Sequence, residues 1–478
     1  MAVSTAQRSD SAHFTVTPRE GGRAYALIWF IQLLAVFSMA TVTLGLTIYK
    51  NSYDTLESHG VLLLAVAFSL TFIPFSLASP LGGLFADRWG PKKTLLISNT
   101  GCLVLLVLSS IFLAAGWLPG WWVWAAVLPA AGCKSIQITG LDAAVPNMLP
   151  KRYISRGNGP RMFLTTPTAA LAYPAASSLM GSVGMQGLLL ITIAILIIAI
   201  FASLWVKALD AHQPGWVAPS TPLPFRGAHK RLRAYVRSRR GLITLFVIFG
   251  VFNFVVGFAE VSDRAICDGF GSSQNLNIVL GIGAAGMLAA SVVIVRRGLP
   301  DRPVRWLIIN CLIFGIALVF GSSRPEFFVV VLATVLFLGS GAYIMAIIGT
   351  LLQTKTEPDL MGRMMGLKQL VVGITYGAGN VVAALCSNFP NNIVPGNQLK
   401  SGFWSYLVGT GEGYGRGFAA LTMLLGIATV VFVVVVARRP TLRDLDTNLP
   451  DVTVEDLAQS QAEPSTVVAG DAGVPDHA

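Results

Sequence analysis

The chain contains a succession of apolar runs, each long enough to cross a lipid bilayer. A membrane-spanning helix needs about 20 apolar residues. Charged residues make up only 12% of the chain, whereas a soluble domain carries about a quarter. The sequence therefore predicts an all-α integral membrane protein with twelve membrane-spanning helices. The expected helices cover residues 24–49, 60–86, 94–116, 121–145, 159–182, 185–206, 241–264, 273–295, 304–321, 327–352, 364–388 and 415–437.

Basic residues are unevenly distributed over the segments between these helices. With the N-terminus placed inside, 28 of the 34 Lys and Arg residues fall on the inner side, Lys368 among them, and 5 fall outside. An excess of Lys and Arg marks the cytoplasmic side of membrane proteins. We therefore expect both termini to be cytoplasmic, in a cell's inner (plasma) membrane. The net charge of +11 then reflects this orientation rather than nucleic-acid binding.

A weak internal repeat divides the chain into two halves. Asp301-Arg302 follows Asp87-Arg88 at about the distance by which Pro358 follows Pro150. Chance similarity between Pro- and Arg-rich loops is the alternative, but two similar offsets favour two six-helix bundles with a substrate site between them. The expected domains are an N-terminal tail (1–23), a first bundle (24–206), a basic linker (207–240), a second bundle (241–437) and an acidic, disordered tail (438–478).

The second part of the linker has the pattern of an amphipathic helix. Residues 226–240 contain seven Lys and Arg residues, while Leu232, Tyr235 and Val236 share one side of a helix. Such a segment typically lies on a membrane surface. We expect it to lie on the inner leaflet. A nucleic-acid patch is the weaker alternative, because the segment is tethered between two spans.

The charged stretch from Gly83 to Lys93 reads GLFADRWGPKK and joins two membrane-length runs. It resembles the G-x-l-a-D-r-x-G-r-k loop between helices 2 and 3 of the major facilitator superfamily of secondary transporters. Pro91 stands where that family usually has Arg, so Lys92 would have to take over a basic contact there. A generic basic loop is the alternative.

Two further stretches resemble one branch of that superfamily, the macrolide-efflux and siderophore exporters. Residues 353–367 read QTKTEPDLMGRMMGL and match its Q-t-x-x-x-P-x-x-x-G-R run, and residues 142–150 read DAAVPNMLP. The resemblance implies twelve helices in two halves. It also implies a conformational gate in which Asp87 faces the positive end of a neighbouring helix near Gly362. The implied gate residues are Gly83, Asp87, Arg88, Gly90, Lys92, Asp142, Gly362 and Arg363.

Ionisable residues inside a bilayer are costly, so they are candidates for function. Lys134 lies halfway along the expected helix 121–145, and with Gln137 it partly resembles the R-x-x-q of antiporters. The alternative is a structural role, in which the Lys134 ammonium is hydrogen-bonded to carbonyl groups or extends to the membrane interface. Glu260 is a candidate for proton coupling, with an i,i+4 pair to Arg264 as the alternative.

Two other polar positions complete the candidate set. Gln32 stands in the first expected helix, which lacks the acidic residue found in the exporter branch. Asp142 is expected to pair with the basic residues of the 83–93 stretch, as the superfamily resemblance implies. The candidates for substrate and proton coupling are therefore Lys134, Gln137, Glu260 and Gln32.

Motifs for enzymatic chemistry are missing from the sequence. It has no G-x-x-x-x-G-K-[ST] for ATP phosphates and no H-E-x-x-H, and no G-x-S-x-G elbow. The five cysteines are scattered, so no disulfide framework or metal site is expected. We expect no enzyme activity and no cofactor.

The sequence and the resemblance together predict a monomeric transporter in the lipid bilayer. It would export an amphiphilic small molecule, such as a drug, siderophore or secondary metabolite, by proton antiport. One alternative is an importer or facilitator of a small metabolite or lysolipid. The other is a receptor or scaffold that kept the fold without transporting.

Overall fold

The computed structural model is helical, with short turns and no strand, over the residues that it describes. These are residues 60–117, 120–148, 151–205, 225–268, 274–300, 302–324, 326–357, 360–386, 415–439 and 442, with part of 23–46. The helices are α2 (Gly60–Ala114), α3 (Gly120–Met148), α4 (Lys151–Trp205), α5 (Phe225–Ser238), α6 (Arg240–Asp268), α7 (Gln274–Arg297), α8 (Pro303–Ser323), α9 (Phe327–Thr354), α10 (Met361–Cys386) and α13 (Gly415–Ala437).

Each of the twelve expected spans contains residues described as helical, although only part of the span 24–49 is described. Helices α2 and α4 each contain two of these spans, joined at a glycine with a left-handed backbone. The φ angle is 82° at Gly90 and 70° at Gly184, values that glycine adopts without steric cost. Within the described residues, eight segments are long and apolar enough to cross a membrane.

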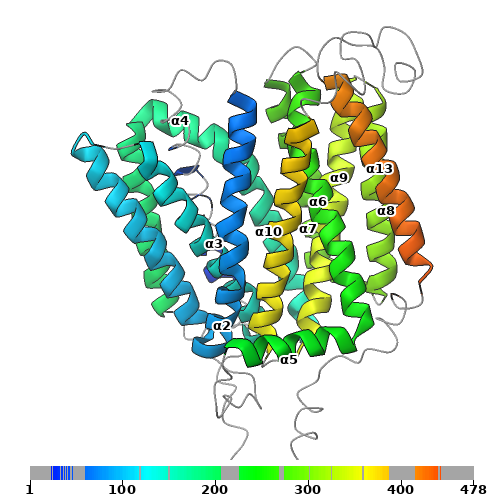
Figure 1. The fold of residues 1–478 in the computed structure, drawn as a ribbon, viewed down its shortest axis with the longest axis horizontal. Coiled ribbons are helices and arrows are strands. Elements are labelled where there is room, and N and C mark those ends of the chain that lie inside the picture. Colours follow the sequence, from blue (N-terminus) through cyan, green and yellow to red (C-terminus); the bar gives the residue numbers. More distant parts are fainter. Residues whose placement is uncertain are drawn as a thin grey trace, which may run out of the picture.

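The helices form two groups that meet along α2 and α10 (Figure 1). Helices α2, α3 and α4 lie in one group, and α6 to α10 with α13 lie in the other. The second group has the larger apolar core, in which Phe314 stacks on Phe337 with ring centroids 4.3 Å apart and packs at a tilt against Phe252 at 4.9 Å. Many large apolar side chains point outward, including Leu77 and Phe328. A bilayer accommodates such a surface, whereas water does not.

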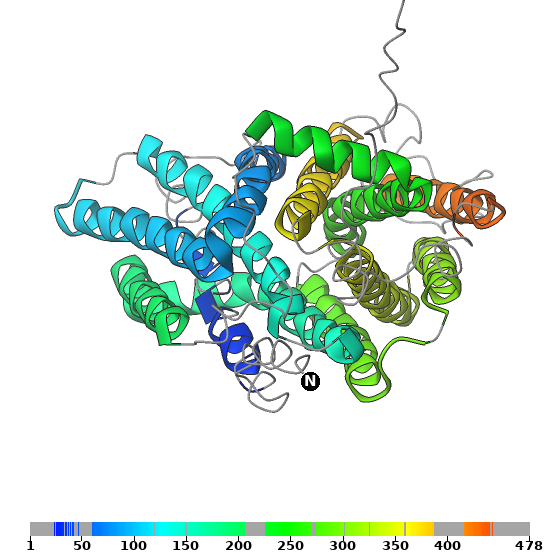
Figure 2. The ribbon, with the colours of Figure 1, turned by 90° about the horizontal axis from the view of Figure 1, so that it is seen from below.

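Helix α5 lies across one end of both groups (Figures 1 and 2), and we call this end of the molecule the α5 end. The amphipathic helix expected in the linker is present, but its apolar side contacts protein. Leu232 and Tyr235 are buried in the core of the second group, and Val236 packs against it. The expectation that this segment lies on the inner leaflet stays a prediction, with most of its apolar side directed at the protein. Residues 1–22, 206–224, 387–414 and 443–478 lie outside the described residues, and these include most of both tails and the first part of the linker.

Candidate functional site

Asp87 caps the first turn of α10 across the boundary between the two groups. Its Oδ1 accepts a hydrogen bond from the backbone nitrogen of Gly362 at 2.6 Å, and its Oδ2 accepts one from the nitrogen of Arg363 at 3.1 Å. The Arg363 side chain adds an ion pair, with Nε 3.4 Å from Oδ2. The first amide groups of a helix have no partner within the helix and carry positive partial charge. A carboxylate therefore stabilises the contact between α2 and α10 at this point.

Small residues bring the backbones of α2 and α10 together beside this carboxylate. A Cβ placed on Gly83 would lie 2.5 Å from the carbonyl oxygen of Gly362, and one on Gly366 would lie 2.8 Å from that of Ser79. No real Cβ tolerates such distances. Close approach through small residues is a common basis of helix association in membranes, where hydrophobic burial supplies little driving force.

A buried ion pair links the same two groups deeper in the structure. Nζ of Lys368 on α10 lies 3.0 Å from Oδ2 of Asp142 on α3, and the exposed fractions of the two side chains are 2% and 0%. The side-chain amide of Gln369 donates a second hydrogen bond to the same oxygen, at 3.3 Å. Asp142 thus pairs with a residue of the opposite half, a partner that the sequence analysis did not consider.

Polar contacts between α3, α4 and α9 extend this boundary. The Gln353 amide donates to the backbone oxygen of Asp142 at 3.2 Å, and the Asn158 amide donates to Oε1 of Gln353 at 2.8 Å. Because Asp142 and Asn158 belong to one group and Gln353 to the other, these bonds hold the groups together. We call the residues Asp87, Asp142, Gly362, Arg363 and Lys368 the inter-half gate.

Helix α5 braces the second group beside the inter-half gate. The Tyr235 hydroxyl donates to the carbonyl oxygen of Lys355 at 2.8 Å. Glu357 forms ion pairs with Arg231 at 3.5 Å and with Arg239 at 3.8 Å. These contacts hold α5 against the segment that follows α9.

Three further residues of the expected gate follow Asp87 in α2, namely Arg88, Gly90 and Lys92. Gly90 forms the turn within α2, where its carbonyl oxygen accepts a hydrogen bond from the Thr94 hydroxyl at 2.9 Å. Arg88 is exposed and Lys92 is half-buried. The glycine thus shapes the turn that follows Asp87.

Gln32 and Gln137 contact each other inside the first group. Gln137 donates through its amide to Oε1 of Gln32, and also to Oδ1 of Asn99 at 2.9 Å. Gln32 donates to the hydroxyl of Ser203 at 3.2 Å. Because all four side chains are buried, this network joins four of the expected helices.

Lys134 lies one turn before Gln137 on α3 and is half-buried. Among the described residues, no hydrogen bond or ion pair joins Lys134 to another side chain. In the part of the chain that the structure describes, the hydroxyl of Ser135, the next residue, and the amide nitrogen of Asn99, whose Oδ1 bonds Gln137, are buried without a hydrogen-bond partner. A buried ammonium is costly when nothing compensates its charge. Lys134 and these two polar groups could therefore bind a polar ligand or water.

Glu260 lies near the end of α6 that is remote from α5. Its Oε2 accepts a hydrogen bond from the hydroxyl of Tyr376 on α10. The Tyr376 ring in turn contacts Phe72 of α2, with centroids 4.7 Å apart. The side chain of Arg264, the alternative partner, lies outside the described residues. Glu260 thus lies beside the boundary between α2 and α10, and no contact among the described residues joins it to Lys134.

Comparison with known families decides the class of protein. A family model described as Major Facilitator Superfamily matches residues 28–380. The chain belongs to this superfamily. Its members are transporters, so the membership fits the apolar helices and the two groups that meet at α2 and α10.

Two curated members of the superfamily are similar over most of this chain. Macrolide efflux protein A of Streptococcus pyogenes is 21% identical over 75% of this chain and 88% of its own length. Multidrug resistance protein MdtG of Escherichia coli is 24% identical over 78% of this chain and 90% of its own. The expected resemblance to the macrolide-efflux branch is thereby confirmed.

Solved structures of the superfamily share the fold. The human organic anion transporter MFSD10 (TETRAN) superposes with a TM-score of 0.65 at 14% identity, covering 86% of this chain and 99% of the transporter. The proton:xylose symporter XylE gives a TM-score of 0.63 at 13% identity, covering 92% of this chain and 99% of the symporter. At such low identity the likeness concerns the fold alone.

Proposed function

We propose that this chain is a secondary active transporter that exports an amphiphilic small molecule by proton antiport. The observation that carries the proposal is the inter-half gate, because its contacts exist only while the two halves meet at the α5 end. A transporter with alternating access needs such contacts to open and close around a central site. The similarity to efflux proteins favours export over import.

The roles within this proposal follow from the site. Lys134, at the middle of α3, binds substrate, and Gln32 and Gln137 hold the surrounding helices in register. Glu260 accepts the coupling proton on the side of the membrane remote from α5. The inter-half gate stabilises the state that is closed at the α5 end, which we assign to the cytoplasm because of the basic-residue bias.

Flux through reconstituted protein tests the transport function. Proteoliposomes with an imposed pH gradient should move a radiolabelled macrolide or an amphiphilic organic anion, and collapse of the gradient with a protonophore should stop net movement. Transport unaffected by the protonophore would contradict proton antiport. Absence of movement for every amphiphile tested, with the protein folded, would favour the receptor or scaffold alternative.

Topology provides a test that is independent of substrate. A cysteine placed at Gly227, in α5, should react with a membrane-impermeant maleimide only from the cytoplasmic side. One placed at Asn397 should react only from outside. The excess of Lys and Arg on the inner segments predicts that the two positions lie on opposite sides of the membrane. Labelling with the opposite sidedness in intact cells and inverted vesicles would overturn the orientation.

Neutralising Asp87 should weaken the gate. Asp87→Asn removes the charge at the start of α10, where such a charge contributes about 0.3–1 kcal/mol, or about 2 when partly buried. That energy changes the balance between closed and open states severalfold. Transport should therefore fall while the amount of protein in the membrane stays normal.

Lys93→Gln, an exposed neighbour on α2, is the control and should transport normally. Wild-type transport by Asp87→Asn would leave Asp87 a surface charge without a role in the gate.

A further inference from the structure

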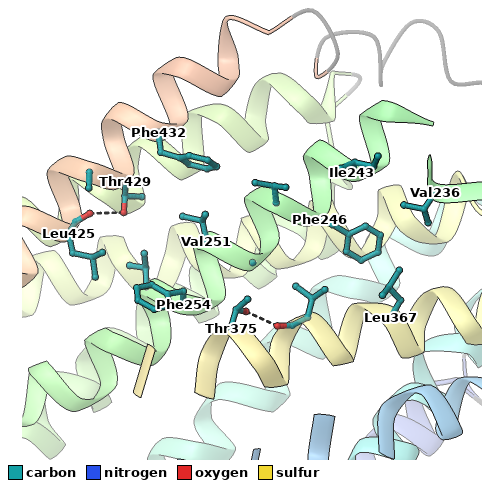
Figure 3. Close-up of a pocket in the computed structure, with 15 residues that line it drawn as sticks. Val236, Ile243, Phe246, Val251, Phe254, Leu367, Thr375, Leu425, Thr429 and Phe432 are labelled. Atoms are coloured by element: carbon teal, nitrogen blue, oxygen red, sulfur yellow. Dashed lines mark hydrogen bonds between the residues drawn. The ribbon is translucent and has the colours of Figure 1, made fainter. Parts of the chain in front are cut away.

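Apolar side chains of the second half line a groove (Figure 3). Helices α6, α10 and α13 form its walls, and Val236 of α5 lines its end. The groove has a volume of about 690 Å³. None of the candidate residues for substrate or proton coupling lines it. It faces the surroundings of the protein, since Ile243 and Val247 in its wall are 41% and 47% exposed.

The groove offers hydrocarbon contact and no available polar group. Its only lining side chains with a hydroxyl are Thr375 and Thr429. Each donates to a carbonyl of its own helix at 2.7 Å, that of Val371 and that of Leu425 respectively. A hydroxyl satisfied in this way does not attract a polar ligand. The groove therefore suits an alkyl chain.

The length of the groove matches one leaflet of a bilayer. Ile243 and Phe254 line it near its two ends along α6. At 1.5 Å per helical residue the distance between these positions is about 16 Å. This is about half of the 30 Å hydrocarbon core of a bilayer. A chain lying in the groove would therefore reach from the α5 end to the middle of the membrane.

Two arginines stand where such a chain would join its headgroup. Arg240 is one turn before Ile243 on α6, so both share the helix face that lines the groove. Arg439 follows the end of α13, whose Phe432 lines the opposite wall. Both arginines are exposed, and neither forms an ion pair with a described residue. Arginine matches phosphate well because its guanidinium donates two parallel hydrogen bonds.

We propose that this groove binds an anionic phospholipid from the leaflet at the α5 end. One acyl chain lies against α6, α10 and α13, and the phosphate contacts Arg240 and Arg439. Basic residues next to a bilayer attract anionic lipids, which accounts for two exposed arginines at this end of an apolar surface. The site is separate from the inter-half gate and does not depend on the transport function proposed above.

Photocrosslinking of the full-length protein tests the site. The probes are phosphatidylglycerol and phosphatidylcholine, each with a diazirine in the acyl chain, at low mole fraction in vesicles of unlabelled phosphatidylcholine. Mass spectrometry of the digested protein should locate the adducts on α6 and α13 within the groove. Labelling by phosphatidylglycerol should exceed that by phosphatidylcholine.

Two variants should change this labelling in different ways. Arg240→Gln with Arg439→Gln should reduce the preference for phosphatidylglycerol by about fivefold per arginine, the equivalent of about 1 kcal/mol for each basic residue near a membrane surface. Ala428→Phe fills the groove from an exposed position of α13, so it should abolish adducts with both lipids. Arg305→Gln, another exposed arginine at this end, and Val431→Phe, an exposed residue of α13 outside the groove, are the matched controls and should label as wild type.

Three results would overturn the proposal. One is labelling spread evenly over the lipid-facing helices, and another is equal labelling by the two lipids in the wild type. The third combines two observations: a macrolide displaces the adducts, and the arginine variants still label fully. The groove would then bind a transported substrate rather than an anionic lipid.

Discussion

Replacing Lys368 by alanine is expected to open the α5 end of the transporter, shifting the balance of states by about two orders of magnitude or more. The Asp142 carboxylate is completely buried beside Lys368. Removing one partner of a buried ion pair costs about 3–5 kcal/mol because the remaining charge is left uncompensated. Opening separates α3 from α10 and lets water reach Asp142. The cost therefore falls on the closed state alone.

Distances between spin labels measure this shift without a substrate. Lys93 on α2 and Arg302 before α8 are both exposed at the α5 end, and cysteines at these positions can carry the labels. The half-buried Cys133 and Cys386 are replaced by alanine, and the other three cysteines are buried. Double electron–electron resonance should then give a longer distance for Lys368→Ala than for the parent protein.

Two controls separate loss of the ion pair from general damage. Asp142→Asn combined with Lys368→Met removes both charges, which is often nearly neutral for a buried pair, so the shorter distance should return. Arg305→Ala removes an exposed cation at the same end and should leave the distance unchanged. A parental distance in Lys368→Ala, or a double variant as open as the single one, would exclude the pair from the gate.

The fold could be predicted because the bilayer imposes a length on every span. The expected helix 121–145 corresponds to α3, Gly120–Met148. Larger differences occur where the helix continues beyond the hydrocarbon. Helix α4 begins at Lys151 rather than at residue 159, because hydropathy detects the apolar part of a helix and not its polar extension. The apolar side of α5 illustrates another limit, since Leu232 suits either a lipid or a protein surface.

The inter-half gate was only partly predictable. The contact of Asp87 with Gly362 followed from the family resemblance, which carries information about packing between distant segments. The Asp142–Lys368 pair did not, because a sequence does not say which faces of two remote helices meet. The sequence contains one sign of this pair, because Lys368 is a cation one turn inside an apolar run. Lys368 entered only the count of basic residues that predicts the orientation. In the structure, Lys368 is the basic partner of Asp142. Asp142 was expected to pair with the 83–93 stretch, in which Pro91 stands where the family usually has Arg.

Replacing Lys134 by alanine is expected to abolish export while leaving the protein folded in the membrane. Lys134 stands at the middle of α3 with no acidic partner among the described residues. Within the same residues, the adjacent Ser135 and the Gln137 partner Asn99 have buried polar atoms without a hydrogen bond. An ammonium in such a place needs a counter-charge, a carbonyl-rich ligand or water. The substrate supplies that partner in our proposal. Export should therefore fall to the level of empty vesicles, while expression and melting temperature stay near the parent values.

Lys134→Arg separates binding from proton transfer. Arginine keeps the positive charge, so counterflow of labelled substrate without a gradient should persist better than in Lys134→Ala. Because arginine does not release its proton in proteins, gradient-driven export should be lost if Lys134 must deprotonate during the cycle. Lys93→Ala removes an exposed lysine at the α5 end and should affect neither assay. Normal gradient-driven export by Lys134→Ala would refute the binding role and would leave Lys134 as a lysine that reaches backbone carbonyls or the interface.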